Sequence, residues 1–384
     1  MSAQDTPQLM RVLFITRKYP PAIGGMEKLS YQLIAEMKCW VEVEAITWGG
    51  SQKWLPGFFV WAFIRAGWIL LTKPVDAVHI GDPVLAPLGV SLRYLGRIPV
   101  FVTAHGLDLT FANRFYQGMI RFCLKRLDGV VCISEYSYSE CLKRGVSPAR
   151  CTVITPGVQD AGPIISRDES RKILEGKLGI SLGGRPVVLS VGRLVKRKGL
   201  AWFVREVMPK LVEANEDILF VVCGDGPMRK SIEAEIKAGR LEAHVVLMGA
   251  VDAQILRAAY FGADVFVMPN IVVPGDPEGF GLVVLEARLA GTPVVASDLE
   301  GIRDAMAEKG SGVLVESGNA AGFLQAILRV LNGQADLRPR EQIRQQVAEK
   351  GSWRSAGEKY FDAFRRWMGL PGVTSRGILS KGHD

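Results

Sequence analysis

Short apolar runs, each ending in a turn and followed by a helical segment, recur along the 384-residue chain. In the first half they span residues 10–16, 41–47, 76–80, 99–104, 128–134 and 152–157, and in the second half residues 186–191, 219–223, 245–249, 263–268 and 293–297. Apolar runs that alternate with helices are typical of parallel strands buried on both faces. The pattern predicts an α/β protein with two doubly wound, Rossmann-like domains, in which the run 293–297 is the last strand.

A polar, glycine-containing stretch at residues 160–185 separates the two sets of strands. Such a stretch is typical of an interdomain linker. We therefore expect an N-terminal domain at residues 1–165 and a second domain at residues 166–350. An amphipathic segment follows at residues 352–367, within a C-terminal part of residues 351–384 that ends in a frayed tail.

Two glycine-containing turns follow predicted strands and favour anion binding. Gly24-Gly25 follows the first strand, and a backbone without Cβ atoms can approach a diphosphate closely. The turn Gly192–Gly199 carries four cations directly after a buried strand, which is unfavourable unless the turn meets an anion.

A third glycine-rich loop, within Pro274–Thr292, reads Glu278-Gly279-Phe280-Gly281 and leads into an apolar helical run that carries Glu286. The N-terminus of a helix presents unpaired N–H groups and a positive dipole end, so phosphate or sugar hydroxyls are expected there. About two helical turns separate the carboxylates, so both can face one cleft. The alternative is that neither carboxylate binds a ligand, with Glu278 capping the helix and Glu286 lying on its solvated face.

His105-Gly106 ends the strand at residues 99–104. Ligands bind at the carboxyl ends of parallel strands, and a neutral imidazole can share protons with sugar hydroxyls. The alternative is a lone histidine satisfied by a backbone carbonyl.

In this order, the motifs resemble those of the family-four retaining glycosyltransferases of the GT-B fold, also described as glycosyl transferases group 1. The resemblance extends from Gly24 to about Trp367. It implies that Glu278 and the amides of Phe280, Gly281 and Leu282 hold the donor sugar and that Glu286 binds the ribose. It also implies that the segment at 352–367 crosses back to the first domain.

Further roles follow from the same resemblance. Arg193 and Lys198 would clamp the leaving diphosphate, whereas Lys196 and Arg197 are expected to be solvated. Gly224, in the turn Gly224-Asp225-Gly226-Pro227, would lie beside the nucleotide, and Val251 would lie against the base.

In the first domain, the resemblance assigns the donor phosphates to Gly24 and Gly25 and the donor sugar to His105. The chain departs from the family at Thr155–Gln159, where the usual Pro-Asn-Gly-Val-Asp is lost, so no role is assigned to that turn.

The resemblance implies transfer of a hexose from a nucleoside diphosphate sugar to the hydroxyl of a glycan or lipid-linked acceptor, with retention of configuration. The catalytic residues would be Glu278, His105, Arg193 and Lys198. No Asp-x-Asp motif is present to hold a metal on the diphosphate, so no metal and no cofactor are expected.

Two other classes of protein remain open. A dinucleotide-dependent oxidoreductase needs Gly-x-Gly-x-x-Gly after its first strand, and this chain offers only Gly24-Gly25 there. The second is a non-catalytic, basic scaffold that binds nucleotide or membrane.

The six cysteines include no Cys-x-x-Cys pair and several lie in apolar runs, which favours buried free thiols in a reducing cytoplasm. Residues 1–10 show no secretory signal pattern. The net charge of +8 favours an anionic membrane surface as a partner, and no nucleic-acid-binding motif is found.

The apolar segment Phe58–Leu71 is interpreted as too short to span a bilayer. Trp61 and Trp68 within it are expected to pack on the sheet, with lipid head groups as the alternative. These features predict a cytoplasmic enzyme that works peripherally at the cytoplasmic face of the membrane.

Overall fold

The computed structural model describes residues 10–22, 24–159 and 164–371. The chain divides into two compact units, the first made of Met1–Gly157 and Ser352–Asp384 and the second of Val158–Gly351. The changeover after Gly157 falls eight residues before the boundary expected at 165/166. The expected frayed tail lies outside the described residues from 372 onward.

The first unit contains a six-stranded parallel sheet with the strand order β2-β1-β3-β4-β5-β6. Its strands are β1 (Arg11–Thr16), β2 (Glu42–Thr47), β3 (Ala77–Ile80), β4 (Val100–Ala104), β5 (Gly129–Cys132) and β6 (Cys151–Val153). Strand β2 lies at the edge, where the exposed Glu42 pairs with Arg11 and the partly buried Glu44 pairs with Lys73.

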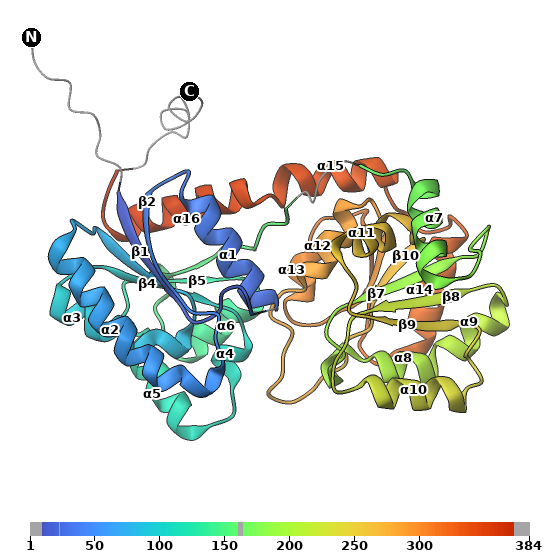
Figure 1. The fold of residues 1–384 in the computed structure, drawn as a ribbon, viewed down its shortest axis with the longest axis horizontal. Coiled ribbons are helices and arrows are strands. Elements are labelled where there is room, and N and C mark those ends of the chain that lie inside the picture. The colour runs from blue at the N-terminus through green and yellow to red at the C-terminus, as the bar shows by residue number, and fades with distance from the viewer. Residues whose placement is uncertain (1–9, 23, 160–163, 372–384) are drawn as a thin grey trace, which may run out of the picture. The chain divides into compact units, whose positions relative to one another are not determined.

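The helices of the first unit pack on both faces of this sheet (Figure 1). They are α1 (Gly25–Met37), α2 (Leu55–Thr72), α3 (Ala86–Gly96), α4 (Leu107–Thr110), α5 (Arg114–Leu124), α6 (Glu135–Lys143) and the C-terminal α16 (Trp353–Trp367). Helix α16 packs beside α1 and on β4, where the ring of Phe364 stacks on Phe101 at 4.7 Å.

The second unit contains another six-stranded parallel sheet, with the order β12-β11-β10-β7-β8-β9. Its strands are β7 (Val187–Val191), β8 (Leu219–Cys223), β9 (Val245–Gly249), β10 (Val265–Met268), β11 (Val294–Ser297) and β12 (Gly312–Val315). Its helices are α7 (Arg167–Leu178), α8 (Leu200–Glu206), α9 (Met208–Ala214), α10 (Arg229–Ala238), α11 (Ala253–Gly262), α12 (Leu282–Leu289), α13 (Ile302–Ala305), α14 (Ala320–Leu331) and α15 (Arg340–Lys350).

The two parallel sheets confirm the predicted fold class, but the expectation that residues 293–297 form the last strand is wrong. Strand β12 follows and pairs with β11 at the edge of the sheet. Its residues, Gly312–Val315, form a short apolar run flanked by glycines, so the local signal was present, but the segment that precedes it carries only a four-residue helix instead of a full helical segment.

Helix α2 differs from its prediction in length and in orientation. It has 18 residues, so the argument that it is too short to span a bilayer is wrong, and among the described residues it is the one helix long and apolar enough to do so. In this fold Phe58, Ala62, Ala66 and Ile69 instead pack into the core of the first unit. The side chains of Trp61 and Trp68 are exposed, contrary to the expected packing on the sheet.

The described cysteines are all free thiols. Four of them are buried as expected, whereas Cys39 is exposed and Cys151 is partly buried.

Candidate active site

The predicted site residues of the second unit follow adjacent strands. The turns after β10, β7, β8 and β9 emerge from one edge of the sheet, because the strands are parallel neighbours. A Cβ atom on Gly224 would lie 1.9 Å from the carbonyl oxygen of Gly192, and one on Gly199 would lie 1.9 Å from that of Pro269. Only glycine permits this contact between backbones, so the turns form one continuous surface.

Glu278 lies at the centre of this surface and is buried. Its Oε2 atom lies 2.7 Å from Nζ of Lys198 and 3.3 Å from Nε of Arg197. Burial alone would raise the pKa of this carboxyl, but Lys198 and Arg197 outweigh burial, and the pKa of Glu278 lies below its ordinary value. Glu278 is therefore ionised at neutral pH.

The two carboxylate oxygens of Glu278 have different surroundings. Lys198, Arg197 and the side-chain amide of Asn270, which donates at 2.9 Å, all contact Oε2. No residue in the described part of the chain hydrogen-bonds to Oε1, so this oxygen can accept hydrogen bonds from a ligand.

Arg197 corrects one expectation from the sequence. It was expected to be solvated, but its guanidinium also pairs with Asp276 at 3.1 Å, so it bridges the loop after β10 and the turn after β7. Lys196 and Arg193 are exposed. The side chain of Arg193 forms no ion pair with the described residues, which leaves its charge available to an anion.

Sequence reasoning missed Asn270 and Glu300. Asn270 follows β10 directly, and its backbone carbonyl accepts hydrogen bonds from the hydroxyls of Ser297 at 2.7 Å and Ser317 at 3.0 Å. Its position at the carboxyl end of a parallel strand was a usable signal. Glu300 accepts a hydrogen bond from the backbone N–H of Glu278, and no local pattern indicated that contact.

Helix α12 begins at Leu282, directly after Phe280 and Gly281. Glu286 lies in its second turn and is partly buried, and its Oε2 accepts a hydrogen bond from the phenol of Tyr260 at 2.7 Å. Tyr260 lies on α11, and nothing in the sequence pointed to it. Burial, followed by the charge of Glu286, raises the pKa of the Tyr260 phenol, which therefore remains a donor.

Gly224 and Val251 belong to neighbouring turns. The N–H of Gly224 donates to the carbonyl of Gly249 at 2.7 Å, which connects the turn after β8 to the end of β9, and Val251 follows two residues later.

The other predicted residues lie in the first unit. The N–H of His105 donates to Asp108 at 3.0 Å, and its Nε2 lies 2.8 Å from the carbonyl oxygen of Gly81, to which it donates. For the Nε2 atom, this contact matches the alternative expected from the sequence, in which a backbone carbonyl satisfies the histidine. The Nδ1 atom is buried and has no hydrogen-bond partner among the described residues.

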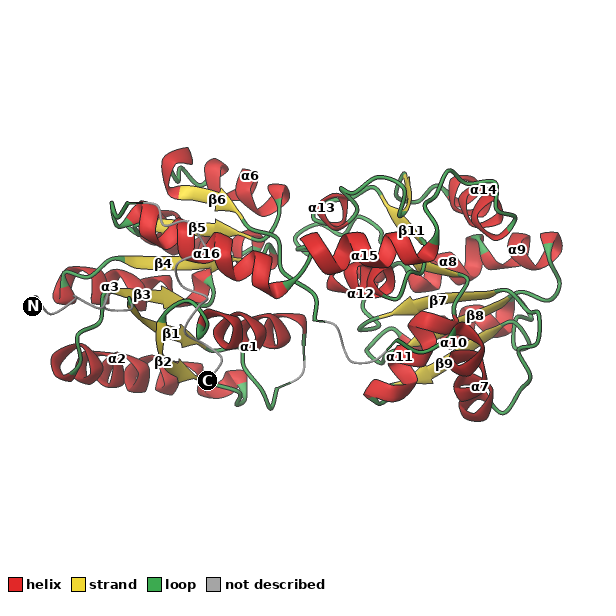
Figure 2. Cartoon of the chain, turned by 90° about the horizontal axis from the view of Figure 1, so that it is seen from above, coloured by secondary structure: helices red, strands yellow, loops and turns green. Residues whose placement is uncertain are grey.

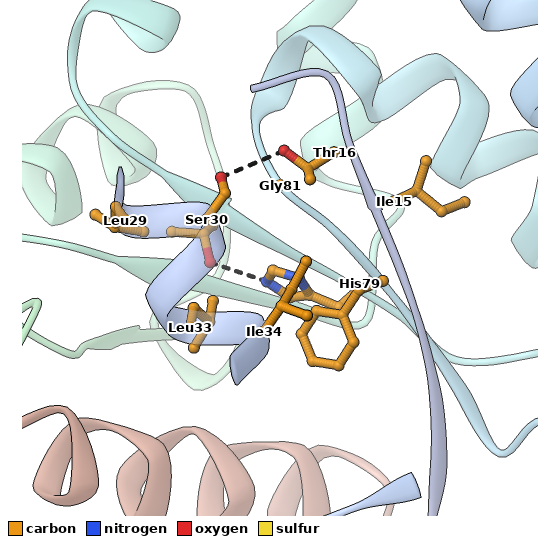
Figure 3. Close-up of a pocket in the computed structure, with 10 residues that line it drawn as sticks. Ile15, Thr16, Leu29, Ser30, Leu33, Ile34, His79 and Gly81 are labelled. Atoms are coloured by element: carbon orange, nitrogen blue, oxygen red, sulfur yellow. Dashed lines mark hydrogen bonds between the residues drawn. The ribbon is translucent and has the colours of Figure 1, made fainter. Parts of the chain in front are cut away.

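Gly24 and Gly25 form the start of α1, where Gly24 is the N-cap. Nearby, Glu27 is buried and pairs with Lys18 at 3.0 Å. A cavity of about 10 Å³ lies beneath α1, between Leu29, Leu33 and His79 (Figure 3). It has room for about one water molecule, so it is too small for a sugar.

Comparison with solved structures identifies the fold. The structure of Anabaena HepE in complex with UDP superposes with a TM-score of 0.72 and 17% identity, covering 93% of this chain and all of that one. Together with the two parallel sheets of six strands, this similarity places the chain in the GT-B fold.

Comparison with sequences identifies the family. The family described as Glycosyl transferases group 1 matches residues 177–350, and the one described as Glycosyltransferase Family 4 matches residues 10–161. An uncharacterized glycosyltransferase of Methanocaldococcus jannaschii is 26% identical over 94% of this chain and its own full length. A GDP-mannose-dependent alpha-(1-6)-phosphatidylinositol monomannoside mannosyltransferase of Mycolicibacterium smegmatis is 26% identical over 82% of this chain and 88% of its own. The chain belongs to the group 1 glycosyltransferases and is a glycosyltransferase.

Proposed function

We propose that this enzyme transfers a hexose from a nucleoside diphosphate sugar to an acceptor hydroxyl, with retention of anomeric configuration and without a metal ion. The observation that carries the proposal is the buried, ionised Glu278, held by Lys198 and Arg197, whose turn also carries the exposed Arg193. The GDP-mannose dependence of the mycobacterial relative and the UDP bound to HepE support a nucleotide-sugar donor.

The chemistry follows from where charge develops. Fission of the bond between the anomeric carbon and the diphosphate oxygen leaves negative charge on the diphosphate. Lys198, Arg193 and the N–H groups at the start of α12 stabilise that charge, and loss of one such contact costs about 3 to 4 kcal/mol. Cations of the chain thus take the role that a metal plays in other transferases, in keeping with the missing Asp-x-Asp motif.

The remaining groups hold the donor. Oε1 of Glu278 accepts hydrogen bonds from sugar hydroxyls, and Glu286, fixed by Tyr260, binds the ribose. His105 contacts the sugar, and Gly24 and Gly25 approach the phosphates. The acceptor attacks the anomeric carbon from the side of the leaving group, and a diphosphate oxygen takes the proton of the acceptor hydroxyl.

A panel of labelled nucleotide sugars tests this proposal. We expect transfer from at least one donor, undiminished by excess chelator, and a product whose anomeric configuration matches that of the donor by NMR. Activity that chelator abolishes and Mg²⁺ or Mn²⁺ restores would contradict metal independence. An inverted product would contradict retention, and nicotinamide-dependent oxidation without transfer would favour an oxidoreductase.

Glu286→Gln is expected to raise the KM for the donor about tenfold or more while kcat changes little, because a ribose contact is equally strong before and during bond fission. Steady-state kinetics with the donor varied measures both constants. Glu341→Gln, an exposed carboxylate on α15, is the control. A fall in kcat at unchanged KM would assign Glu286 to the reacting sugar instead.

The acceptor is proposed to be lipid-linked, because one layer of the first unit is apolar on its outside. Helices α2, α3 and α5 pack side by side. Their exposed apolar side chains, here called the outer layer, are Trp54, Val60, Trp61, Phe63, Ile64, Trp68 and Leu71 on or beside α2, Tyr94 and Leu95 on α3, and Phe111, Phe115 and Phe122 on or beside α5. Exposed Arg65, Arg114 and Arg121 lie among them.

Aromatic side chains interspersed with arginines are typical of proteins that lie at a membrane interface. The phosphatidylinositol monomannoside acceptor named for the mycobacterial relative supports the same interpretation. We therefore place the enzyme peripherally on the cytoplasmic face of a membrane, with the outer layer toward the lipid.

Vesicle co-sedimentation tests this placement. Binding should require anionic lipid and weaken as salt rises, since each basic residue near the surface contributes on the order of 1 kcal/mol. The triple variant Trp61→Gln, Trp68→Gln, Phe115→Gln should bind at least tenfold more weakly, because each buried aromatic contributes about 2 kcal/mol. Tyr31→Gln, an exposed aromatic on α1 outside the outer layer, is the matched control. Equal binding by the two variants would show that the outer layer is not the surface that binds the membrane.

A further inference from the structure

Three of the six cysteines meet inside the first unit, and none of them has been assigned a role above; Cys132 pairs across the sheet with Ala104, the residue before His105. The Sγ atoms of Cys132, Cys141 and Cys151 all lie within 4.8 Å of one another. Cys132 and Cys141 are the closest pair, with 3.7 Å between their sulfur atoms. We call these three residues the cysteine cluster.

The fold explains how residues from three segments come together. Strands β5 and β6 pair with Val130 opposite Cys151 and Cys132 opposite Val153. Because side chains alternate along a strand and neighbours in register share a face, Cys132 and Cys151 point to the same face of the sheet. Helix α6 connects these two strands and packs against both, and it carries Cys141 (Figure 2).

Burial and access both suit a bound ion. Cys132 and Cys141 are fully buried, so water does not compete with their sulfur atoms. Cys151 begins β6, which is the edge strand of the sheet, and it is partly exposed. The cluster therefore lies nearest the surface at Cys151, on the edge strand.

The spacing of the sulfur atoms fits a single metal ion. With metal–sulfur bonds of about 2.3 Å, three sulfurs around one ion lie about 3.8 to 4.0 Å apart. The sulfur atoms of the cluster thus need to move by less than about 1 Å. Cysteine sulfur is a soft ligand that selects monovalent copper and zinc over harder ions.

The number of ligands separates these two ions. The group found in the described part of the chain consists of the three cysteines, with no fourth histidine, cysteine or carboxylate. Structural zinc needs four ligands in a tetrahedron, whereas monovalent copper is stable with three sulfurs. We propose that the cysteine cluster is a three-coordinate site for one Cu(I) ion.

In this site each Cu–S bond replaces an S–H bond, and the displaced proton passes to solvent. The copper stays monovalent, so no oxidant or reductant takes part. The bound ion connects β5, α6 and β6, and it should stabilise the first unit because it binds the folded chain and not the separated cysteines.

Cu(I) binding is measured under anaerobic conditions, with the ion delivered from a coloured Cu(I) chelator that also reports the free concentration. All proteins carry Cys39→Ser, because the exposed Cys39 would bind copper non-specifically. We expect one copper per chain after desalting, a rise in melting temperature of several degrees, and protection of three thiols from alkylation. Zn²⁺ as the probe should bind at least a hundredfold more weakly.

Two substitutions form a matched pair. Cys141→Ala removes a buried thiol of the cluster, and Cys123→Ala removes a buried thiol of the same unit outside the cluster. We expect Cys123→Ala to retain copper and Cys141→Ala to bind it at least a hundredfold more weakly. If Cys141→Ala fails to fold, Cys151→Ser at the partly exposed edge position makes the same test.

Several results would overturn the proposal. They are no copper retained by the parent protein, equal retention by the parent, Cys141→Ala and Cys151→Ser, or tighter binding of Zn²⁺ than of Cu(I). A disulfide between two cluster cysteines that forms in air and persists in place of copper, seen by mass spectrometry, would also count against it.

Discussion

Lys198→Ala and Arg193→Ala are each expected to lower kcat for glycosyl transfer by about a hundredfold or more. Both cations are proposed to act on charge that develops on the diphosphate as the glycosidic bond breaks, and removing one such contact typically costs 10² to 10³ in kcat. The diphosphate of the bound donor is already anionic, so the KM should rise as well, but the additional charge that develops as the bond breaks makes the fall in kcat the larger effect. Steady-state kinetics with the best donor of the panel measures the two constants.

The two variants differ in what they do to the fold. Arg193 is exposed, so its replacement should leave the melting temperature unchanged. Lys198 pairs with the buried Glu278, and its loss leaves that carboxylate with Arg197 and Asn270 alone. A lower melting temperature is therefore expected for Lys198→Ala, and Lys198→Arg should recover stability more fully than turnover.

Lys196→Ala is the matched control, since Lys196 is an exposed cation in the same turn. It should keep nearly normal kcat. Near-normal turnover of folded Lys198→Ala and Arg193→Ala would contradict the proposal that these two cations stabilise the leaving diphosphate. An equal loss in Lys196→Ala would show that the turn acts only through its total charge.

Glu278→Gln is expected to lower kcat by about a hundredfold with a smaller change in KM for the donor. Glutamine has the shape of the carboxylate but lacks its charge, so Oε1 becomes a weaker acceptor for sugar hydroxyls, and Lys198 and Arg197 lose their partner. The contact to the sugar strengthens as the anomeric carbon becomes positive, whereas the contact to the nucleotide does not.

Asp276→Asn is the control for Glu278→Gln, because Asp276 lies in the same loop and pairs with the same Arg197. It should change kcat by less than about threefold. Kinetics in which Glu278→Gln raises only the KM, while Glu286→Gln lowers only kcat, would interchange the roles of the two carboxylates.

The sequence predicted the order of elements well because the signals are local. Strand ends were placed within about two residues for β1, β4, β7 and β8, since each combines an apolar run with a glycine or proline turn. Strand β12 was missed although Val313–Val315 is an apolar run between glycines, because the segment before it contains only a four-residue helix and does not show the strand–helix alternation. The motifs around Lys198, Gly224 and Glu278 were found because each is a contiguous pattern of a few residues in the loop that follows β7, β8 or β10.

Helix α2 shows what local patterns leave open. Its residues are apolar almost all round, so periodicity does not say which side faces the sheet. The stripe formed by Phe58, Ala62, Ala66 and Ile69 packs inward, which turns Trp61 and Trp68 outward. The small alanines let the helix lie close to the sheet. The rotation of the helix on the sheet is therefore set by packing and not by hydrophobicity.

The sequence by itself determined that this chain forms two parallel α/β sheets and that its anion-binding turns follow particular strands, because hydrophobic periodicity and glycine turns act over a few residues. Only the tertiary structure decided that Lys198 and Arg197 share one oxygen of Glu278, that Tyr260 holds Glu286, and that three cysteines form a cluster. The physical reason is that these contacts join side chains from separate segments, and their distances depend on sheet register and on how each helix is rotated on its sheet.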